Sequence, residues 1–206
     1  MIEAAIEVLK EGGLSALTLA EVSRRSRVSI GSIYCRVDGK DALLREVQAV
    51  VLHDIEREFA LLVNRVRRKT LQLPELIPAL VRELAMYLRR HSALLSAFMQ
   101  QGDQDPIVEA VGRKAYQQNV LDFKLVLLER HSEFHHPDPE QAATTCFTVI
   151  YASLARFLGL GVSPSGQSST SEAEWKQLVE DLGLMTLAFL TADSHAIQLP
   201  SGKLER

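Results

Sequence analysis

The spacing of apolar residues constrains this chain most, because it follows the period of an α-helix in one long block after another. Leu43, Val47, Val50, Ile55 and Phe59 recur in this way along a segment predicted to be one helix over about 39–67. No segment shows the convincing alternation of apolar and polar residues that a half-buried strand requires. The sequence therefore predicts an all-α protein of about nine helices.

Local signals set the ends of these helices. Gly12 and Gly13 end a first helix predicted over 2–11. Thr18 with Glu21, and Ser171 with Glu174, have the spacing of a capping box. Side chains expected to cap other helix starts are Ser29, Asp38, Asp105 and Asp138, and prolines expected in a first helical turn are Pro74, Pro106 and Pro139. Later helices are predicted near 74–90, 92–100, 106–130, 139–160 and 171–191, with a flexible Gly- and Ser-rich insert at 161–171.

Composition excludes several classes of protein. Hydrophobic residues make up 47% of the 206 residues and charged residues 24%, which is typical of a folded globular chain and not of a disordered one. No apolar run approaches the roughly 18 residues that a membrane helix needs, and residues 1–13 lack the pattern of a signal peptide. The two cysteines, Cys35 and Cys146, form no CxxC pair, which favours a reducing compartment. We therefore expect a cytoplasmic protein with no membrane partner.

Charge is distributed unevenly along the chain. The net charge is −3, but residues 24–45 carry six basic and two acidic side chains, whereas residues 46–206 carry 16 basic and 20 acidic ones. Phosphate binding responds to local charge, because each neutralised phosphate releases condensed counterions. This asymmetry favours a nucleic-acid-binding unit near the N-terminus on an acidic body.

Residues 18–40 read as two short helices joined by a tight turn, with a third helix starting at once. In the second helix, around 30–36, Ile33 and Val37 are expected to face a small core. Its other side carries small, polar and basic groups, as in a helix that enters the DNA major groove. The sequence therefore predicts a helix-turn-helix.

Three sequence pieces carry a family resemblance: E-G-G-x-x-A-L-T-L, V-S-I-G-S-I-Y and G-K-D-A-L-L. With them, residues 4–45 resemble the TetR family of transcriptional regulators. The resemblance implies a helix-turn-helix DNA-binding domain over 1–45 and a helical effector-binding and dimerisation domain over 46–206. It also implies a ligand-responsive regulator, a homodimeric repressor that a small hydrophobic effector releases from double-stranded operator DNA.

The candidate DNA contacts come from both arguments. The hydroxyl of Thr18 and nearby free N–H groups can meet a phosphate, and the first turn of the helix at 30–36 can reach base edges. The resemblance matches Tyr34 and Lys40 to phosphate contacts, and it places Arg36 where the family usually has histidine. The full set of candidate DNA-binding residues is Thr18, Ser29, Ile30, Gly31, Ser32, Tyr34, Arg36 and Lys40.

Several alternatives remain open at this point. Tyr34 could fill the small core, and Arg24, Arg25 and Arg27 could form an ordinary solvated face. Arg27 stands where the family's turn holds glycine, so backbone strain is expected there, and Val37 replaces a usual aromatic. These departures keep open a helical adaptor that has lost DNA binding.

The body offers a dimer face and a pocket. The helices near 139–160 and 171–191 combine small and large apolar residues, which suits packing against a second copy. Aromatic and soft apolar residues could line an effector pocket, although each suits a core equally well. These candidates are Tyr87, Phe98, Met99, Tyr116, Phe123 and Tyr151.

Catalytic chemistry has no support in this sequence. It contains no phosphate-binding glycine loop, GxSxG or HExxH motif, so an all-α enzyme is a weaker alternative, and no cofactor is expected. His131 and His135 have the spacing of two metal ligands on one helical face. They lie where a helix should end, a place that favours histidine anyway, and no metal site is expected.

Overall fold

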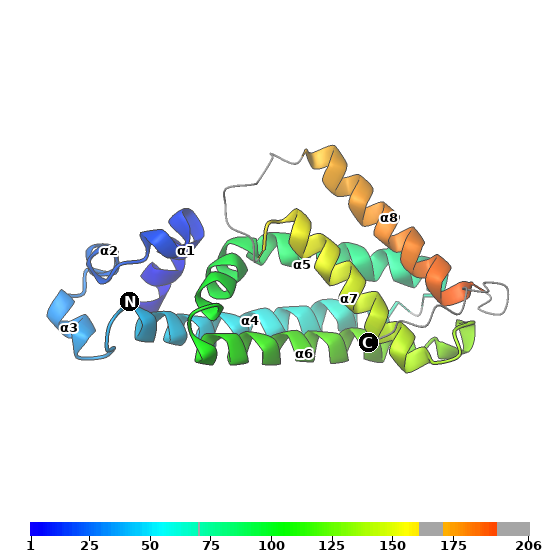
Figure 1. Ribbon diagram of the computed structural model, residues 1–206, viewed down its shortest axis with the longest axis horizontal. Helices are drawn as coiled ribbons and strands as arrows, with labels where there is room; N and C mark the ends of the chain where they lie inside the picture. The colour runs from blue at the N-terminus through cyan, green and yellow to red at the C-terminus, as the bar shows by residue number, and fades with distance from the viewer. Residues whose placement is uncertain (70, 161–170, 193–206) are drawn as a thin grey trace, which may run out of the picture.

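The computed structural model describes residues 1–69, 71–160 and 171–192. These residues form eight α-helices, a short 3₁₀ helix and no strand, which confirms the predicted all-α fold. Figure 1 shows a small N-terminal unit at one end of an elongated helical body. The helices are α1 (Ile2–Ala16), α2 (Leu19–Ser26), α3 (Ile30–Tyr34), α4 (Lys40–Arg67), α5 (Leu73–Gly102), α6 (Pro106–Leu128), α7 (Pro139–Phe157) and α8 (Glu172–Thr191), with the 3₁₀ helix η1 (His131–Glu133) between α6 and α7.

Glycines shape two joints of the N-terminal unit. Gly13 has a φ of 65° and interrupts the regular part of α1, close to the predicted end. Gly39, with a φ of 105°, occupies the N-cap position of α4, and no side chain caps that helix. The prediction that Asp38 caps this helix is therefore wrong. The turn at Gly39 places the helix start one residue further along than an Asp38 cap requires.

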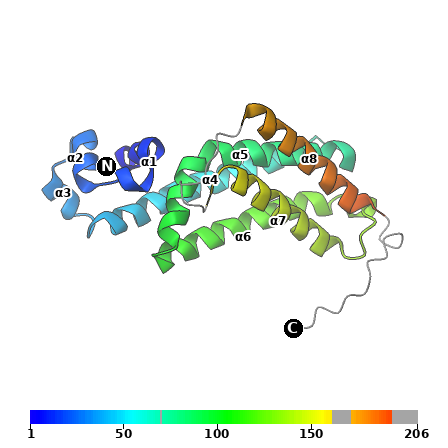
Figure 2. The ribbon, with the colours of Figure 1, turned by 45° about the horizontal axis from the view of Figure 1, so that its top comes forward.

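Helix α5 is one continuous helix of 30 residues, so the predicted break near residue 91 is wrong. The sequence Arg-Arg-His-Ser-Ala-Leu-Leu around that point contains neither proline nor glycine, and most of its residues are good helix formers. Figures 1 and 2 show the last turns of α5 bending toward α1, and the two helices pack against each other. This contact joins the N-terminal unit to the body.

The predicted starts of the last three helices are confirmed. Asp105 and Asp138 accept hydrogen bonds from backbone N–H groups of α6 and α7, each ahead of a first-turn proline. Ser171 and Glu174 form the complete capping box that opens α8. The flexible insert predicted at 161–171 lies outside the described residues, except for Ser171.

One continuous core runs through the described residues. It includes Leu9 and Ile33 of the N-terminal unit, Phe59 of α4, and Leu84 and Phe147 of the body. Helix α4 reaches from one region to the other in both views (Figures 1 and 2). In the described part of the chain, no helix is long and apolar enough to cross a bilayer.

Candidate nucleic-acid interface and internal cavity

The turn between α2 and α3 is tight and held by side chains. Arg27 adopts the left-handed conformation, with a φ of 56° and a ψ of 22°, and is the one non-glycine residue with positive φ in the described ranges. The hydroxyl of Ser23 donates to the Val28 carbonyl at 2.7 Å and closes the turn. The expected departure from a relaxed backbone at Arg27 is therefore confirmed.

The two apolar side chains predicted to face the small core, Ile33 of α3 and Val37 just after it, point inward, whereas Ile30 at the start of α3 is 45% exposed. Ile33 and Val37 are buried against the N-terminal core, whereas the Tyr34 side chain is 59% exposed. An exposure of this size rules out Tyr34 as the plug of the small core in this conformation. Helix α3 and the residues that flank it therefore present one outer face, the α3 face, and the exposed residues on it are Ser29, Ile30, Gly31, Ser32, Tyr34 and Arg36.

The start of α3 is stabilised by its own serines. Ser29 Oγ accepts a hydrogen bond from the Ser32 amide at 3.2 Å and lies 2.8 Å from Ser32 Oγ. A Cβ placed on Gly31 would meet no atom within 4 Å, so packing inside the protein does not require glycine there. The lack of a side chain at Gly31 leaves the backbone of this first turn accessible from outside.

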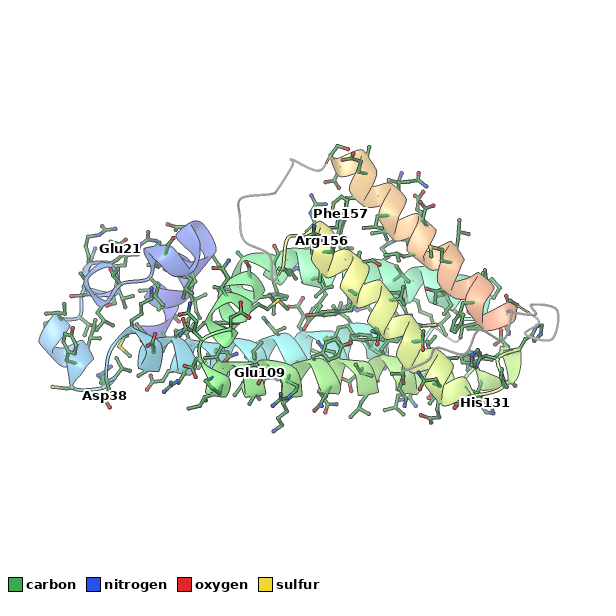
Figure 3. All side chains as sticks on the ribbon, in the orientation of Figure 1. Glu21, Asp38, Glu109, His131, Arg156 and Phe157 are labelled. Carbon is green, nitrogen blue, oxygen red and sulfur yellow. The ribbon has the colours of Figure 1, made fainter. Side chains whose placement is uncertain are left out.

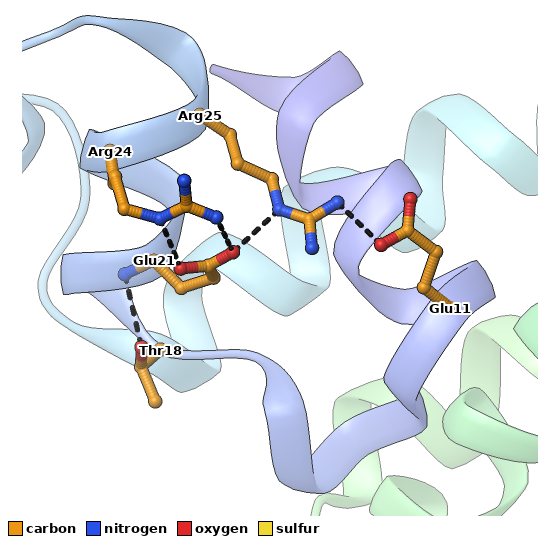
Figure 4. A network of polar contacts seen from close by, with 5 residues as sticks. All are labelled: Glu11, Thr18, Glu21, Arg24 and Arg25. Carbon is orange, nitrogen blue, oxygen red and sulfur yellow. Dashed lines mark hydrogen bonds and ion pairs between the residues drawn. The ribbon is translucent and has the colours of Figure 1, made fainter.

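An ion-pair network fixes the outer side of α2 (Figure 4). Glu21 accepts hydrogen bonds from Arg24 at 2.6 and 2.8 Å and from Arg25 at 2.6 Å, and Arg25 also pairs with Glu11 at 2.8 Å. These guanidinium groups hold the pKa of Glu21 at about 2, below its ordinary 4.5. Arg24 and Arg25 are therefore paired within the protein.

The capping box at the start of α2 is only half formed. Thr18 Oγ1 accepts a hydrogen bond from the Glu21 amide at 3.1 Å, as predicted. The Glu21 carboxylate bonds Arg24 and Arg25 instead of reaching back to the Thr18 amide, because charged donors compete better for it. The Thr18 side chain remains exposed beside the free first turn of α2.

Lys40 begins α4 and ties it to the end of α1. Its Nζ donates a hydrogen bond to the Leu14 carbonyl oxygen at 2.9 Å, and the residue is half-buried. A lysine ammonium has three donors, so this bond leaves capacity for an external acceptor. The structure thus places Lys40 on the N-terminal unit, with one of its donors already used.

A cavity of about 410 Å³ lies among α4, α5, α6 and α7 of the body. Figure 3 marks its region through Glu109 on α6, well away from Asp38 at the turn after α3. Five of the six predicted pocket residues line this cavity: Tyr87, Phe98, Met99, Tyr116 and Tyr151. Phe123 does not line it; this ring is buried and packs against Phe147 at a centroid distance of 5.3 Å.

The cavity also has polar lining residues that the sequence reasoning missed, including Gln48, Glu56 and Asn119. Gln48 and Asn119 are both buried. Gln48 lies four residues from both Leu44 and Leu52, so it occupies the buried register of α4. A polar residue in an apolar register was the signal that could have identified it.

Two contacts connect α4 to the start of α6. Arg45 Nε donates to Asp105 Oδ2 at 2.7 Å, and Gln48 Nε2 donates to the Val108 carbonyl at 2.9 Å. The Arg45 guanidinium lowers the pKa of Asp105 below its usual value, and backbone N–H groups of Ile107 and Val108 lower it further. Gln48 therefore belongs both to the cavity lining and to this connection.

The apolar residues of α7 and α8, the two helices predicted to form a dimer face, divide into two groups. Ala142, Ala143, Cys146, Ile150, Leu154 and Leu182 are buried in the core of the chain. Val149, Leu184, Met185 and Phe189 are large apolar residues that stay exposed on α7 and α8. The two helices lie side by side in Figures 1 and 2 and contact each other, so they carry exposed apolar surface within the same part of the body.

The segment 131–136, which carries His131, His135 and His136, does not form a metal site in this structure. Across the described ranges, no group of three or more His, Cys, Asp or Glu side chains is placed to hold a metal ion. Glu133 instead accepts a hydrogen bond from the Leu73 amide at 3.0 Å, so it satisfies a free donor at the start of α5.

Comparison with known proteins gives a match at the N-terminus. Residues 1–47 match the family model of bacterial regulatory proteins of the tetR family. No match to this chain was found among curated proteins. The matched segment contains the three N-terminal helices and the first turns of α4.

Solved structures resemble the whole fold. A Thermobifida fusca transcriptional regulator of the TetR/AcrR family is 20% identical with a TM-score of 0.61, covering 90% of this chain and 93% of its own. A Rhodococcus regulatory protein in the tetR family is 16% identical with a TM-score of 0.62, covering 92% and 94%. The fatty acid degradation regulator FadR from Bacillus halodurans is 14% identical with a TM-score of 0.61, covering 90% and 92%. At these low identities, the TM-scores and the coverage of both chains show a shared fold.

Proposed function

We propose that this chain is a dimeric transcriptional repressor of the TetR type, because residues 1–47 match the family model of bacterial regulatory proteins of the tetR family. A small hydrophobic effector in the body cavity would release it from operator DNA. The observation that carries the DNA-binding part is the outward face of α3, where Ser32, Tyr34 and Arg36 are exposed while Ile33 anchors the helix. We place the DNA-binding domain at 1–45 and the effector and dimerisation domain at 46–206.

The proposed contacts fall into two kinds. Thr18, Tyr34 and Lys40 would bind phosphates and position the domain, whereas the first turn of α3 and Arg36 would meet base edges. Exposed Ile30 suits an apolar contact with a thymine methyl group, and the open backbone at Gly31 allows close approach. The serine hydroxyls of Ser29 and Ser32 can bond a base or a phosphate.

A mobility-shift titration against the intergenic DNA beside the protein's own gene tests this function. We expect a complex that weakens steeply with added salt, because phosphate neutralisation releases counterions. Tyr34→Ala and Lys40→Ala should weaken binding to all DNA sequences, with Tyr34→Phe separating the ring from its hydroxyl. Absence of any complex at low salt on such fragments would contradict the proposal and favour the adaptor alternative.

Dimerisation is proposed through α7 and α8. One three-helix unit reads too few bases for selectivity, so two copies on a two-fold site are needed. The exposed apolar residues of these helices, Val149, Leu184, Met185 and Phe189, are the surface available for a second copy.

A matched pair of variants tests this surface by light scattering. Leu184 on α8 is 66% exposed, and Leu61 on α4 is 63% exposed, so both tolerate a charge in an isolated chain. Leu184→Glu should produce monomers and abolish the specific DNA complex, while Leu61→Glu should leave the dimer intact. Dimers that persist in Leu184→Glu would place the interface elsewhere.

We propose that effector binding in the cavity acts on α4 and thereby releases the DNA. Gln48 lines the cavity and bonds the Val108 carbonyl, and Arg45 one turn earlier bonds Asp105 at the start of α6. A ligand that prefers a different spacing of α4 and α6 would shift the two recognition helices of a dimer. The ligand must bind the released state more tightly, and that difference in affinity sets the size of the response.

A further inference from the structure

Among the described residues, one buried side-chain polar atom has no hydrogen-bond partner, and it belongs to a residue that lines the cavity. Asn119 is 6% exposed, and its Nδ2 donates to the Tyr87 hydroxyl at 3.3 Å. Its Oδ1 accepts no hydrogen bond from any described residue, although it is buried in the cavity lining. An unpaired carbonyl oxygen in such a place costs free energy, so its retention points to a ligand that donates a hydrogen bond.

The ionised side chains around the cavity carry an excess of negative charge. Glu56, Asp103 and Glu109 line it together with a single cation, Arg113. Arg113 is already paired with Glu109 at 2.8 Å. Among the described residues, Glu56 and Asp103 have no ion-pair partner, in contrast to Glu58, which pairs with His91 at 2.9 Å and with Arg90. The uncompensated carboxylates favour a cationic ligand.

The cavity walls are aromatic. Tyr87, Phe98, Tyr116 and Tyr151 line it, and the rings of Tyr116 and Tyr151 meet edge to face at a centroid distance of 5.0 Å. Burial raises the pKa of Tyr87 and the pKa of Tyr151, so both hydroxyls stay neutral at physiological pH. Aromatic faces attract cations and also pack against apolar groups.

Four ligand classes satisfy these features to different degrees. An alcohol can donate to Asn119 Oδ1 but leaves the carboxylates uncompensated, and a quaternary ammonium ion compensates the charge but has no N–H to donate. A carboxylate opposes both features. A protonated amine on an apolar body provides the donor, the positive charge and the surface that the aromatic walls can cover.

We propose that this cavity binds a protonated organic amine with an apolar body, whose N–H donates to Asn119 Oδ1 and whose charge is compensated by Glu56. The regulatory consequence rests on the proposed function, because only a repressor would turn this binding into release of DNA. The amine narrows the hydrophobic effector of that function to an amphiphilic cation.

Calorimetric titration with four probes that share one body tests the proposal: phenylhexylamine, phenylhexanol, phenylhexanoate and trimethyl(phenylhexyl)ammonium. We expect the amine to bind about tenfold more tightly than the alcohol, the effect of one added charge interaction. The carboxylate should bind most weakly. A carboxylate that binds as tightly as the amine, or an amine that does not bind at about 1 mM, would overturn the proposal.

Two variants separate the charge from the hydrogen bond. Glu56→Gln should weaken the amine and the trimethylammonium ion by several-fold while leaving the alcohol unchanged. Asn119→Leu should weaken the amine and the alcohol but leave the trimethylammonium ion unchanged. Glu46→Gln is the matched control, because it removes the same charge from an exposed site on α4 outside the cavity lining. If Glu56→Gln leaves the ratio of amine to alcohol affinity unchanged, the charge assignment is wrong.

Urea unfolding and mobility shifts on the same preparations keep the outcomes distinct. The double variant Tyr87→Phe with Asn119→Leu replaces both polar partners with apolar groups of similar shape, so it should stay folded while losing the amine preference. DNA release by phenylhexanoate and not by phenylhexylamine would overturn the amine and leave the repressor standing. Amine binding without any DNA complex would support the ligand class and contradict the proposed function.

Discussion

The N-terminal unit turns Ser32, Tyr34 and Arg36 of the α3 face toward solvent, whereas the body encloses Tyr87 and Asn119 in a cavity among four helices. The two regions share one continuous core, so they differ in where the polar groups point and not in how they are held. In the N-terminal unit, the exposed fraction of a side chain is enough to distinguish a site residue from a core residue. In the body, site residues and core residues are both buried. There, only a polar atom without a hydrogen-bond partner or a charge without an ion-pair partner distinguishes a site residue from a core residue.

The largest effect on stability should come from the aromatic wall of the body. Phe147 is fully buried and contacts the rings of Tyr116, Phe123 and Tyr151 at centroid distances of 5.5, 5.3 and 5.7 Å. Phe147→Ala should lower the free energy of unfolding by about 3–5 kcal/mol, measured by urea denaturation. Leu125→Ala, at an exposed position on α6 outside the proposed dimer surface, is the control and should change it by less than about 0.5 kcal/mol.

The Phe147→Ala variant should still bind DNA at urea concentrations below its unfolding midpoint, which would separate the stability of the body from the DNA-binding surface. The outward face of α3 does not contact Phe147, so its geometry should survive. A loss below about 1 kcal/mol in Phe147→Ala would mean that the wall relaxes easily and that the cavity is less preorganised than its packing indicates.

The second effect concerns DNA selectivity. Arg36 is exposed just after α3, so Arg36→Ala should leave the stability of the free protein nearly unchanged. It should reduce the preference for operator over random DNA by about 1–3 kcal/mol, the contribution of one base contact, measured by competition mobility shifts. Equal losses on operator and random DNA would reassign Arg36 to phosphate binding.

Sequence reasoning predicted the N-terminal unit nearly residue by residue, because each position there has one requirement. Ile33 and Val37 had to fill a small core, and Thr18 and Ser29 had to cap helices. It failed at Asp38, where the left-handed turn at Gly39 moved the helix start, and at the Glu21 half of a capping box, where two arginines took the carboxylate. In both cases a neighbouring residue determined the outcome, and the capping preference of a single residue does not include the effect of its neighbours.

The body was less predictable for a physical reason. An aromatic residue at a helical period is compatible with a cavity wall and with a core, and only packing among several helices decides which it becomes. Phe123 was therefore assigned to the pocket although its ring is buried against Phe147, while Tyr116 of the same helix does line the cavity. Asn119 was overlooked because its unpaired Oδ1 becomes visible only after the neighbouring helices are placed.

A smaller effect tests the strain in the N-terminal turn. Arg27 pays a left-handed conformational penalty that glycine avoids, so Arg27→Gly should raise the free energy of unfolding by about 1 kcal/mol. Arg27→Ala removes the same side chain but keeps the strained conformation, so it should give no such gain. Urea denaturation of both variants gives the comparison, and equal midpoints would show that the turn is not strained.

The smallest effect concerns the paired arginines of α2. Because the pKa of Glu21 is lowered from 4.5 to about 2 in the folded protein, its ion pairs stabilise the fold above pH 4.5 and lose this contribution as the pH falls toward 2. Glu21→Gln should therefore lower the urea midpoint slightly at neutral pH and leave it unchanged at the acid end of that window, the small size following from solvent exposure.

The same substitution separates internal pairing from DNA contact. Glu21→Gln releases Arg24 and removes one of the two partners of Arg25, so binding to random DNA should strengthen and its salt dependence should steepen. Glu46→Gln changes the net charge equally and is the control. If Glu21→Gln and Glu46→Gln change the affinity for random DNA equally, the change in net charge alone explains the effect. A response confined to Glu21→Gln would show that the N-terminal unit limits its own nonspecific affinity by pairing two arginines within the chain.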